Sequence, residues 1–125
     1  MNRLLHWTNL LNIYEVYKAT VSGVDGNFRQ RVEQLMTQVP EGRVTTYGDL
    51  AAMAGQPNAA RIVGGIAHFG NADLPWHRLV NRFGGLASGF HGGREAQSQL
   101  LAQEGVSCTN HLVDNFKAVR WRPSL

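Results

Sequence analysis

The 125-residue sequence lacks the features that define several classes of protein. Its single cysteine, Cys108, makes an internal disulfide impossible and excludes a disulfide-stabilised secreted scaffold. No apolar run approaches the roughly 18 residues that a transmembrane helix needs. Five scattered histidines and one cysteine give no metal-ligand spacing, and the sequence has no phosphate-binding glycine loop, serine elbow or paired-carboxylate motif. The sequence therefore predicts no metal, no cofactor and no membrane partner.

The sequence also has only a small excess of positive charge. Twelve basic residues against nine acidic ones give a net charge of +3, which permits an anionic partner without requiring one. Ten of the twelve basic residues are arginine, whose side chain suits forked phosphate contacts and stacking. An apolar fraction of 43% and a charged fraction of 17% are typical of one globular domain that buries its own core.

Residues 1–26 are predicted to be an N-terminal appendage, and residues 27–125 the domain itself. Polar residues interrupt the apolar ones near the start, and no small-residue cleavage site follows, so we do not predict a signal peptide. The spacing of the apolar residues fits an amphipathic helix about as well as a strand. The sequence thus leaves the order of this appendage open.

A helix-turn-helix is predicted in the middle of the domain. Apolar residues at helical spacing predict a first helix over 28–39. Thr46 and Asp49 resemble a capping box that opens a second helix, and Gly55 stands where that helix would end. A third helix is expected from Ala59 to about Phe69, after a short turn. The predicted N-terminal caps of the first and third helices are Asn27 and Asn58.

Short strands and one further helix are predicted beyond residue 70. Residues 75–80 suggest a compact turn leading into a strand, and residues 106–121 hold apolar pieces that suit paired extended segments. A helix ended by Gly105 places four residues on one face: Gln97, Leu100, Leu101 and Glu104. The fold class is therefore α/β in a small, mainly helical form with short strands, built around a helix-turn-helix.

The third predicted helix is almost bare of long side chains. Arg61, in its first turn, is followed by the adjacent Gly64 and Gly65, and each glycine costs a helix about 1 kcal/mol relative to alanine. These glycines suit either close packing against a neighbouring element or close approach to DNA, which Arg61 would then probe. The roles of His77 and Glu104 are also open at this point. His77 fits a hydrogen-bonded structural histidine as well as a functional one, and Glu104 fits a carboxylate at the end of a helix.

Five motifs in order resemble the DNA-binding domain of O6-alkylguanine-DNA alkyltransferases, over about residues 28–121. They read Gly-Arg-Val-Thr-Thr-Tyr-Gly from residue 42, Ala-Ala-Arg-Ile-Val-Gly-Gly from 59, Asn71, Pro-Trp-His-Arg-Leu-Val-Asn from 75 and Leu-Leu-Ala-Gln-Glu-Gly from 100. In that family the fourth of these motifs carries Pro-Cys-His-Arg, and its Cys accepts the alkyl group. Trp76 stands at that position, so the sequence resembles the alkyltransferase-like proteins that keep the damage-binding apparatus without the nucleophile.

The resemblance implies a role for each matching residue. Arg61 matches the finger that fills the vacancy left by a flipped nucleotide, and Tyr47 matches the residue that presses on the neighbouring phosphate. The implied DNA-binding residues are Thr46, Tyr47, Ala60, Arg61, Gly64 and Gly65. The residues implied to line an alkylguanine pocket are Pro75, Trp76, Leu79, Phe90 and His91. Asn71, His77 and Glu104 match the hinge and relay of the active enzymes and are expected to survive as structural hydrogen-bonding groups.

The function implied is that of a non-enzymatic sensor, which flips O6-alkylguanine in duplex DNA and marks it for nucleotide excision repair. An indole nitrogen donates a hydrogen bond but is no nucleophile, so no catalytic residue is expected. The implied partners are duplex DNA and nucleotide excision repair proteins, met by a monomer in the cytoplasm at the nucleoid. Two alternatives remain: a helix-turn-helix transcription regulator, and an alkyltransferase that uses Cys108.

Overall fold

The computed structural model describes residues 26–123, so the predicted appendage lies outside the described residues except for Gly26. The helices are α2 (Phe28–Gln38), α3 (Tyr47–Met53), α4 (Ala60–Phe69), the 3-10 helix η1 (Trp76–Arg78), α5 (Gly93–Gln103) and α6 (Phe116–Val119). The strands are β1 (Thr45–Thr46), β2 (Leu79–Val80), β3 (Cys108–Thr109) and β4 (Leu112–Val113). No helix within this described part is long and apolar enough to span a membrane.

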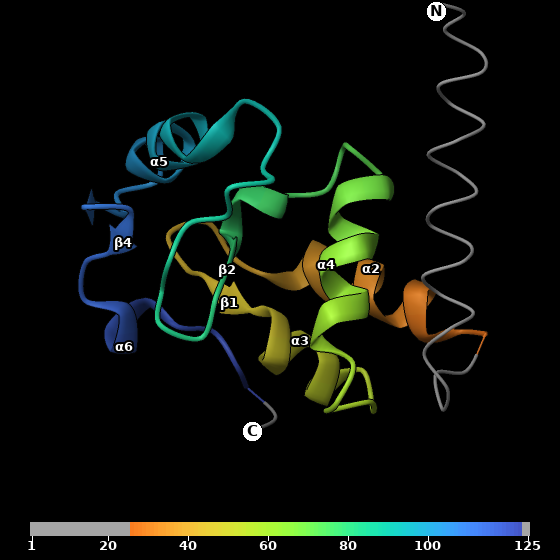
Figure 1. Cartoon of the computed structure of the whole chain (residues 1–125). Helices are drawn as coiled ribbons and strands as arrows, with labels where there is room; N and C mark the ends of the chain where they lie inside the picture. The colour runs from red at the N-terminus through yellow and green to blue at the C-terminus, as the bar shows by residue number, and fades with distance from the viewer. Residues whose placement is uncertain (1–25, 124–125) are drawn as a thin grey trace, which may run out of the picture.

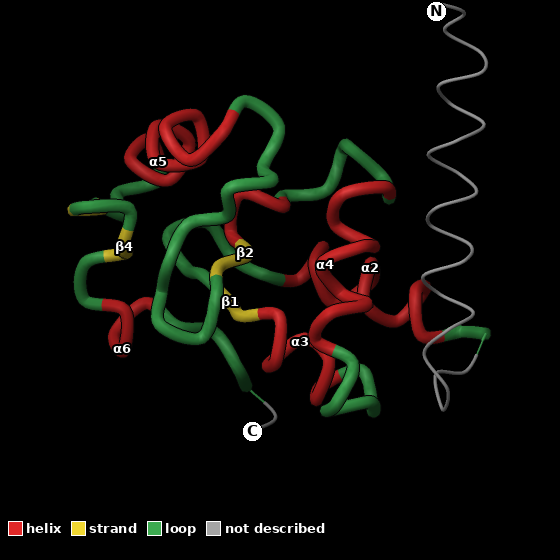
Figure 2. Tube along the Cα trace, viewed as in Figure 1, coloured by secondary structure: helices red, strands yellow, loops and turns green. Residues whose placement is uncertain are grey.

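The elements form two groups joined by a short parallel ladder. Figure 1 shows α2, α3 and α4 gathered on one side and α5 and α6 on the other, with β1 and β2 between them. Strand β1 pairs in parallel with β2, and β3 pairs with β4 in an antiparallel hairpin. The tube in Figure 2 shows how little of the chain is strand, so helices and loops position most of the side chains.

Two hydrophobic clusters match this division. The larger cluster packs the apolar faces of α2, α3 and α4 around Met36, Leu50 and Ile62. The smaller one joins Val44, just before β1, and Val80 of β2 to Leu101 of α5. The elements that the site needs are therefore held by two separate cores that meet at β1 and β2.

The helix-turn-helix prediction is confirmed, Asn27 occupies the predicted cap position of α2 without a capping side-chain bond, and the predicted cap of α4 is wrong. The Thr46 side chain accepts a hydrogen bond from the Asp49 amide at 3.0 Å, and α3 ends before Gly55, which has a left-handed φ of +90°. Asn27 makes no side-chain capping bond to α2, and Ala59 rather than Asn58 occupies the cap position of α4. An alanine cannot cap with its side chain, so the first amides of α4 have no side-chain acceptor from that position.

The C-terminal segment returns to the helix-turn-helix. Val119 was expected in an extended piece, but it ends α6, and the extended bridge joins Arg120 to Val44 instead. The Arg120 guanidinium then binds both oxygens of the buried Asp49 carboxylate, at 2.7 and 2.9 Å. This forked pair fastens the end of the chain to α3.

Candidate nucleic-acid interface

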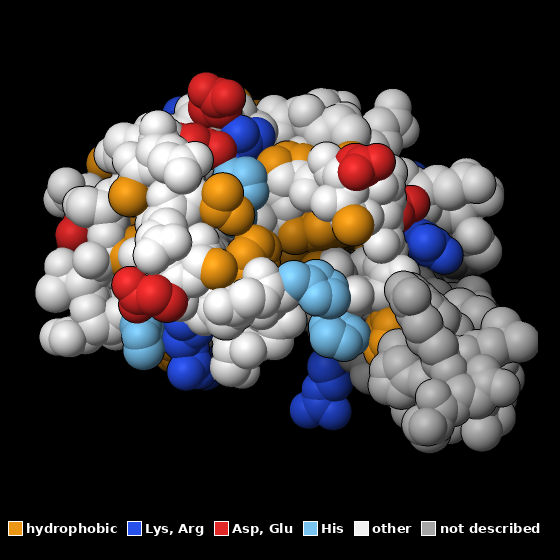
Figure 3. Space-filling view, turned by 90° about the horizontal axis from the view of Figure 1, so that it is seen from above, with side chains coloured by type: hydrophobic (Ala, Val, Ile, Leu, Met, Phe, Trp, Pro, Cys, Tyr) orange, Lys and Arg blue, Asp and Glu red, His pale blue; other side chains and the backbone are white. Residues whose placement is uncertain are grey.

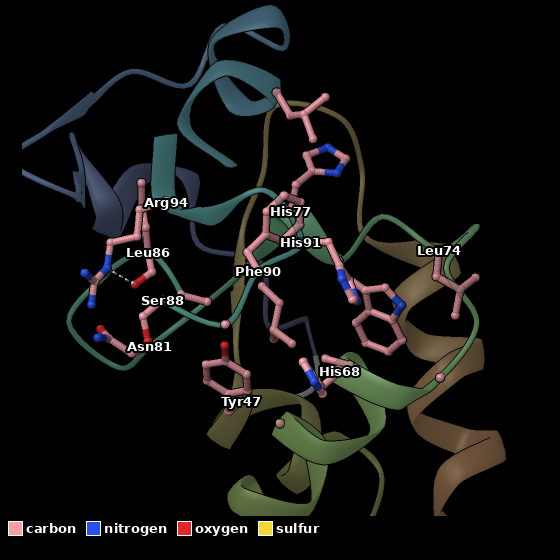
Figure 4. Close-up of a pocket in the computed structure, with 18 of the residues that line it drawn as sticks. Tyr47, His68, Leu74, His77, Asn81, Leu86, Ser88, Phe90, His91 and Arg94 are labelled. Atoms are coloured by element: carbon pink, nitrogen blue, oxygen red, sulfur yellow. Dashed lines mark hydrogen bonds between the residues drawn. The ribbon is translucent and has the colours of Figure 1, made fainter. Parts of the chain in front are cut away.

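A cavity of about 580 Å³ opens between α4 and the loop that precedes α5. One wall comes from α3 and α4, and the opposite wall from residues 85–91, which we call the wall loop. Figure 3 shows hydrophobic side chains within this hollow and His side chains at its edge. In Figure 4, Tyr47 and His68 rise from α3 and α4 toward Ser88 and Phe90 of the wall loop. This size lies in the range of roughly 300–1,000 Å³ that small-molecule sites occupy.

Trp76 forms a side of this cavity with its polar hydrogen already used. The side chain is 8% exposed, and its indole Nε1 donates a hydrogen bond to the Asn71 carbonyl at 2.7 Å. The indole therefore has only its hydrocarbon ring surface to offer to a group in the cavity. Such a surface can pack against an alkyl substituent but has no atom that could accept one.

His77 and Glu104 are brought together, with Arg78 as a third member. His77 Nε2 lies 2.7 Å from Glu104 Oε2, and the Arg78 guanidinium donates to both carboxylate oxygens at 2.7 to 3.2 Å. Burial opposes ionisation of Glu104, but hydrogen bonds from Arg78, His77 and the Gly42 amide outweigh it and lower its pKa to about 2. Glu104 is therefore an anion engaged with three neighbours, as a structural group would be.

Two other residues of the predicted site have different surroundings. Among the described residues, the hydrogen bonds of Asn71 join it to Glu33, Asp73, Leu74 and Trp76, and none joins it to His77 or Glu104. Pro75 is not among the residues that line the cavity, whereas the other four predicted lining residues are. Pro75 is the residue that caps the N-terminus of η1.

Helix α4 presents a nearly smooth surface beside the cavity. Arg61 is exposed in its first turn, and its side chain makes no hydrogen bond or ion pair to another described residue. A Cβ built on Gly64 would meet only Tyr47 Cε1, at an ordinary contact distance of 4.0 Å. Close packing within the chain therefore does not require glycine at position 64. Burial raises the pKa of the neighbouring Tyr47 phenol, which keeps this hydroxyl neutral.

The wall loop is held by hydrogen bonds to Gln97, a role that the sequence pattern did not predict. This fully buried side chain accepts a hydrogen bond from the Ala87 amide at 2.8 Å and donates to the carbonyls of His77 and Leu79 at 3.1 and 2.9 Å. One amide thus joins α5, the wall loop and the η1–β2 segment. The available signal was a polar residue on the same helical stripe as the buried Leu101.

Cys108 lies apart from the cavity. It belongs to β3, packs against the smaller cluster and does not line the cavity. Burial raises the pKa of its thiol, which lowers the fraction of nucleophilic thiolate. Across residues 26–123, no group of three or more His, Cys, Asp or Glu side chains is placed to hold a metal ion. The cavity wall therefore contains no sulfur nucleophile.

Comparison with known proteins places this architecture among DNA-binding domains. The model of the 6-O-methylguanine DNA methyltransferase DNA-binding domain matches residues 27–106. A DNA base-flipping protein of Escherichia coli (strain K12) is 42% identical over 99 residues, which cover 78% of this chain and 76% of that protein. Alkyltransferase-like protein 1 of Schizosaccharomyces pombe is 30% identical over 103 residues, covering 77% of this chain and 95% of that protein.

A solved structure shares the fold. The crystal structure of S. pombe Atl1 in complex with damaged DNA containing O6-carboxymethylguanine superposes with a TM-score of 0.70 at 28% identity, covering 80% of this chain and 99% of that one. The fold is thus the small, mainly helical DNA-binding fold with short strands that the sequence predicted. The chain belongs to the family of the 6-O-methylguanine DNA methyltransferase DNA-binding domain.

Proposed function

We propose that this protein is a non-enzymatic sensor of O6-alkylguanine in duplex DNA. It holds the alkylated nucleotide outside the base stack, in the cavity, and marks the site for nucleotide excision repair. The observation that carries the proposal is Trp76: where the family resemblance expects the acceptor Cys, the cavity has an indole whose one polar hydrogen is bonded to Asn71. The ring can hold an alkyl group by contact, without bond formation.

The surface of α4 supports binding to the backbone and grooves of DNA with little reading of sequence. Of the α4 residues that line the cavity, Gly64 and Ala67 offer no base-edge hydrogen bonds of the kind that regulators use, and only His68, in the last turn, has a polar side chain. Arg61 is free to enter the stack from the first turn of α4, where its guanidinium would replace the stacking of the departed base. Tyr47, one helix away, lies on the cavity side of α4 and would press on the phosphate beside the lesion.

The lesion contributes to its own selection. Rotating a nucleotide out of the stack costs a few kcal/mol and costs least where the base is poorly paired. An alkyl group on O6 of guanine disrupts normal pairing, so the alkylated nucleotide enters an extrahelical site more readily than its neighbours. The hydrophobic wall around Trp76, Leu79 and Phe90 then favours the apolar substituent.

The test is binding to a duplex with one O6-methylguanine against the same duplex unmodified, followed by intact-mass measurement of the protein. We expect tighter lesion binding at unchanged mass. A mass gain of one methyl group would establish an alkyltransferase, through Cys108 or any other residue. Equal affinity for the two duplexes, with one unmodified sequence strongly preferred, would establish a transcription regulator.

The link to excision repair needs a separate measurement. Purified nucleotide excision nuclease should cut a plasmid with one O6-methylguanine faster when this protein is present, and an unmodified plasmid should show no change. Sedimentation of the protein with the lesion duplex should give one protein per duplex, since we propose a monomer. An unchanged rate of incision would remove the marking role while leaving lesion binding intact.

A further inference from the structure

Residues 119–121, at the end of α6 and just beyond it, run back along the start of the helix-turn-helix, and we call them the C-terminal latch. The Val44 amide donates to the Val119 carbonyl at 2.9 Å, and the Trp121 amide donates to the Val44 carbonyl at 2.6 Å. The Arg43 guanidinium donates to two latch carbonyls, at 3.0 and 2.8 Å. Figure 1 shows this part of the chain passing beside β1 on its way to the C-terminus. The latch therefore fixes the backbone immediately before β1.

A second anchor of the latch lies in the first turn of α3. Arg120 donates through Nε to Asp49 Oδ2 at 2.7 Å and through Nη2 to Asp49 Oδ1 at 2.9 Å. The Asp49 side chain is only 6% exposed, and its backbone amide donates to Thr46 Oγ1 at 3.0 Å. A fork of two charge-assisted hydrogen bonds is strong and has one preferred geometry, so it fixes the direction of this short helix as well as its distance from the latch.

Tyr47 begins α3 between these two anchors. Its hydroxyl makes no hydrogen bond to another described residue, so packing and the backbone alone set the direction of its side chain. The ring packs against the larger cluster and lines the cavity, and Figure 4 shows it pointing from α3 toward the wall loop. A small tilt of α3 would therefore move the phenol without breaking any hydrogen bond that the phenol itself makes.

The latch lies beyond the part of the chain that matches the family model, which ends at residue 106. That match includes Tyr47, but the residues that fasten the start of α3 to the C-terminal segment lie outside it. Binding groups have to be held within about 0.5 Å of their productive position by neighbours that are themselves fixed. Arg120 is such a neighbour, because it joins the latch to Asp49 by two hydrogen bonds.

We propose that Arg120 is a positioning residue for nucleotide flipping. Through Asp49 it holds the first turn of α3 so that the Tyr47 side chain meets the phosphate beside the alkylated nucleotide. This role rests on the proposed lesion-binding function and requires no contact between Arg120 and the base. The guanidinium is already engaged within the protein, because it is bonded to Asp49 and lies over the Phe116 ring, 5.3 Å from its centroid.

The variant Arg120→Lys tests this role, because lysine keeps the charge beside the buried carboxylate but cannot form the fork. The quantity to measure is the lesion preference, defined as the Kd for the unmodified duplex divided by the Kd for the same duplex with one O6-methylguanine. We expect this preference to fall by roughly threefold to tenfold, the size of a typical coupling between contacting residues, while the affinity for the unmodified duplex stays nearly unchanged. The matched control is Arg122→Lys, at the exposed position just beyond the latch, which should keep the wild-type preference.

A double-variant cycle with Tyr47→Ala separates positioning from a general loss of stability. Tyr47→Ala should keep part of the lesion preference, because Arg61 and the hydrophobic wall remain. In that background Arg120→Lys should cause no further loss of preference, whereas urea unfolding should show that it destabilises both backgrounds equally. An arginine that acted by loosening the whole domain would instead reduce the preference by the same factor with and without the Tyr47 ring.

A second measurement and a second variant complete the test. A 2-aminopurine next to the lesion brightens when its neighbour leaves the stack, and stopped-flow fluorescence should show a slower rise with Arg120→Lys but not with Arg122→Lys. The paired variant Asp49→Asn, Arg120→Gln removes both charges together and so leaves no unpaired ion in the interior. It should lose the lesion preference as Arg120→Lys does.

The outcomes separate this role from the function on which it rests. If the wild type binds the two duplexes equally, the proposed function fails, and the role of Arg120 fails with it. If the wild type prefers the lesion but Arg120→Lys keeps the full preference and flipping rate, Arg120 does not position Tyr47 and the inference alone is overturned. It is also overturned if Arg120→Lys weakens binding to both duplexes equally, which indicates direct contact with DNA, or if its effect on the preference persists in Tyr47→Ala.

Discussion

Arg61 is the one long side chain that the first turn of α4 holds out to solvent, free of hydrogen bonds to other described residues. Arg61→Ala should weaken lesion binding more than any other single change on α4, by about tenfold or more, since stacking in the gap is worth about 1–3 kcal/mol. Arg61→Lys keeps the charge but loses the planar group, so it should recover only part of the affinity. Arg29→Ala on α2 is the control; if Arg61→Ala equals this control, Arg61 does not enter the stack.

Glu104 makes the stability of the folded protein depend on pH in the acid range. Its pKa is lowered to about 2 in the folded state, below the ordinary value of 4.5, so its stabilising effect is complete above about pH 4.5 and is lost as the pH falls toward 2. The free energy of unfolding should therefore decrease through this window. Glu104→Gln should be less stable at pH 7, by on the order of 1–3 kcal/mol, and should flatten the decrease. Urea unfolding at several pH values measures both; a parallel acid dependence in the variant would contradict the assignment.

At the scale of elements, α4 combines poor helix propensity with an open surface. Gly64→Ala should raise the free energy of unfolding by about 0.5–1 kcal/mol, because alanine is the better helix former and its Cβ meets only an ordinary contact. The same methyl group would stand between α4 and DNA, so affinity for both duplexes should fall. Thermal unfolding and a binding titration on one preparation measure these two opposite changes. A stabilised variant with unchanged affinity would show that DNA does not approach α4 at Gly64.

Helix α5 acts on the site through a single buried amide. Gln97→Leu would leave the Ala87 amide and the carbonyls of His77 and Leu79 without their partner, at a cost of about 1–3 kcal/mol. Because Ala87 belongs to the wall loop, lesion binding should weaken more than binding to unmodified DNA. Gln99→Leu, at an exposed position of the same helix, should change neither. Equal losses for the two duplexes would reduce Gln97 to a purely structural role.

Some features of the structure follow from local sequence patterns, and others depend on contacts between distant residues. The capping box at Thr46 and the terminator at Gly55 are local signals, and the structure forms both. The Asp49–Arg120 pair joins residues 71 positions apart, and no local pattern indicates it. The stacking of the His68 ring on the His91 ring is equally distant from local rules, since it depends on how the wall loop returns to α4. The resemblance supplied four residues of the cavity, Trp76, Leu79, Phe90 and His91, which composition and periodicity alone could not assemble.

For the whole molecule, the small net charge of +3 limits how many phosphates can be neutralised. Affinity for unmodified DNA should fall with salt along a shallow log–log slope of roughly −2 to −3, which corresponds to two or three phosphates by counterion release. Fluorescence anisotropy between about 50 and 200 mM salt measures the slope. A slope near zero would exclude phosphate contacts, and one near −10 would indicate a far larger basic surface than this chain carries.

The bridge between Val44 and Arg120 has a consequence for how the protein is made. It closes a loop that contains most of the described chain, so Val44, just before β1, has this bridge partner only after residues near 120 have left the ribosome. Until then Asp49 is without its cation, and the smaller cluster lacks Val113. Non-local closure of this kind slows folding and exposes apolar surface in the meantime. During synthesis, the helix-turn-helix therefore lacks part of its packing until residues near 120, translated long after its own, have emerged.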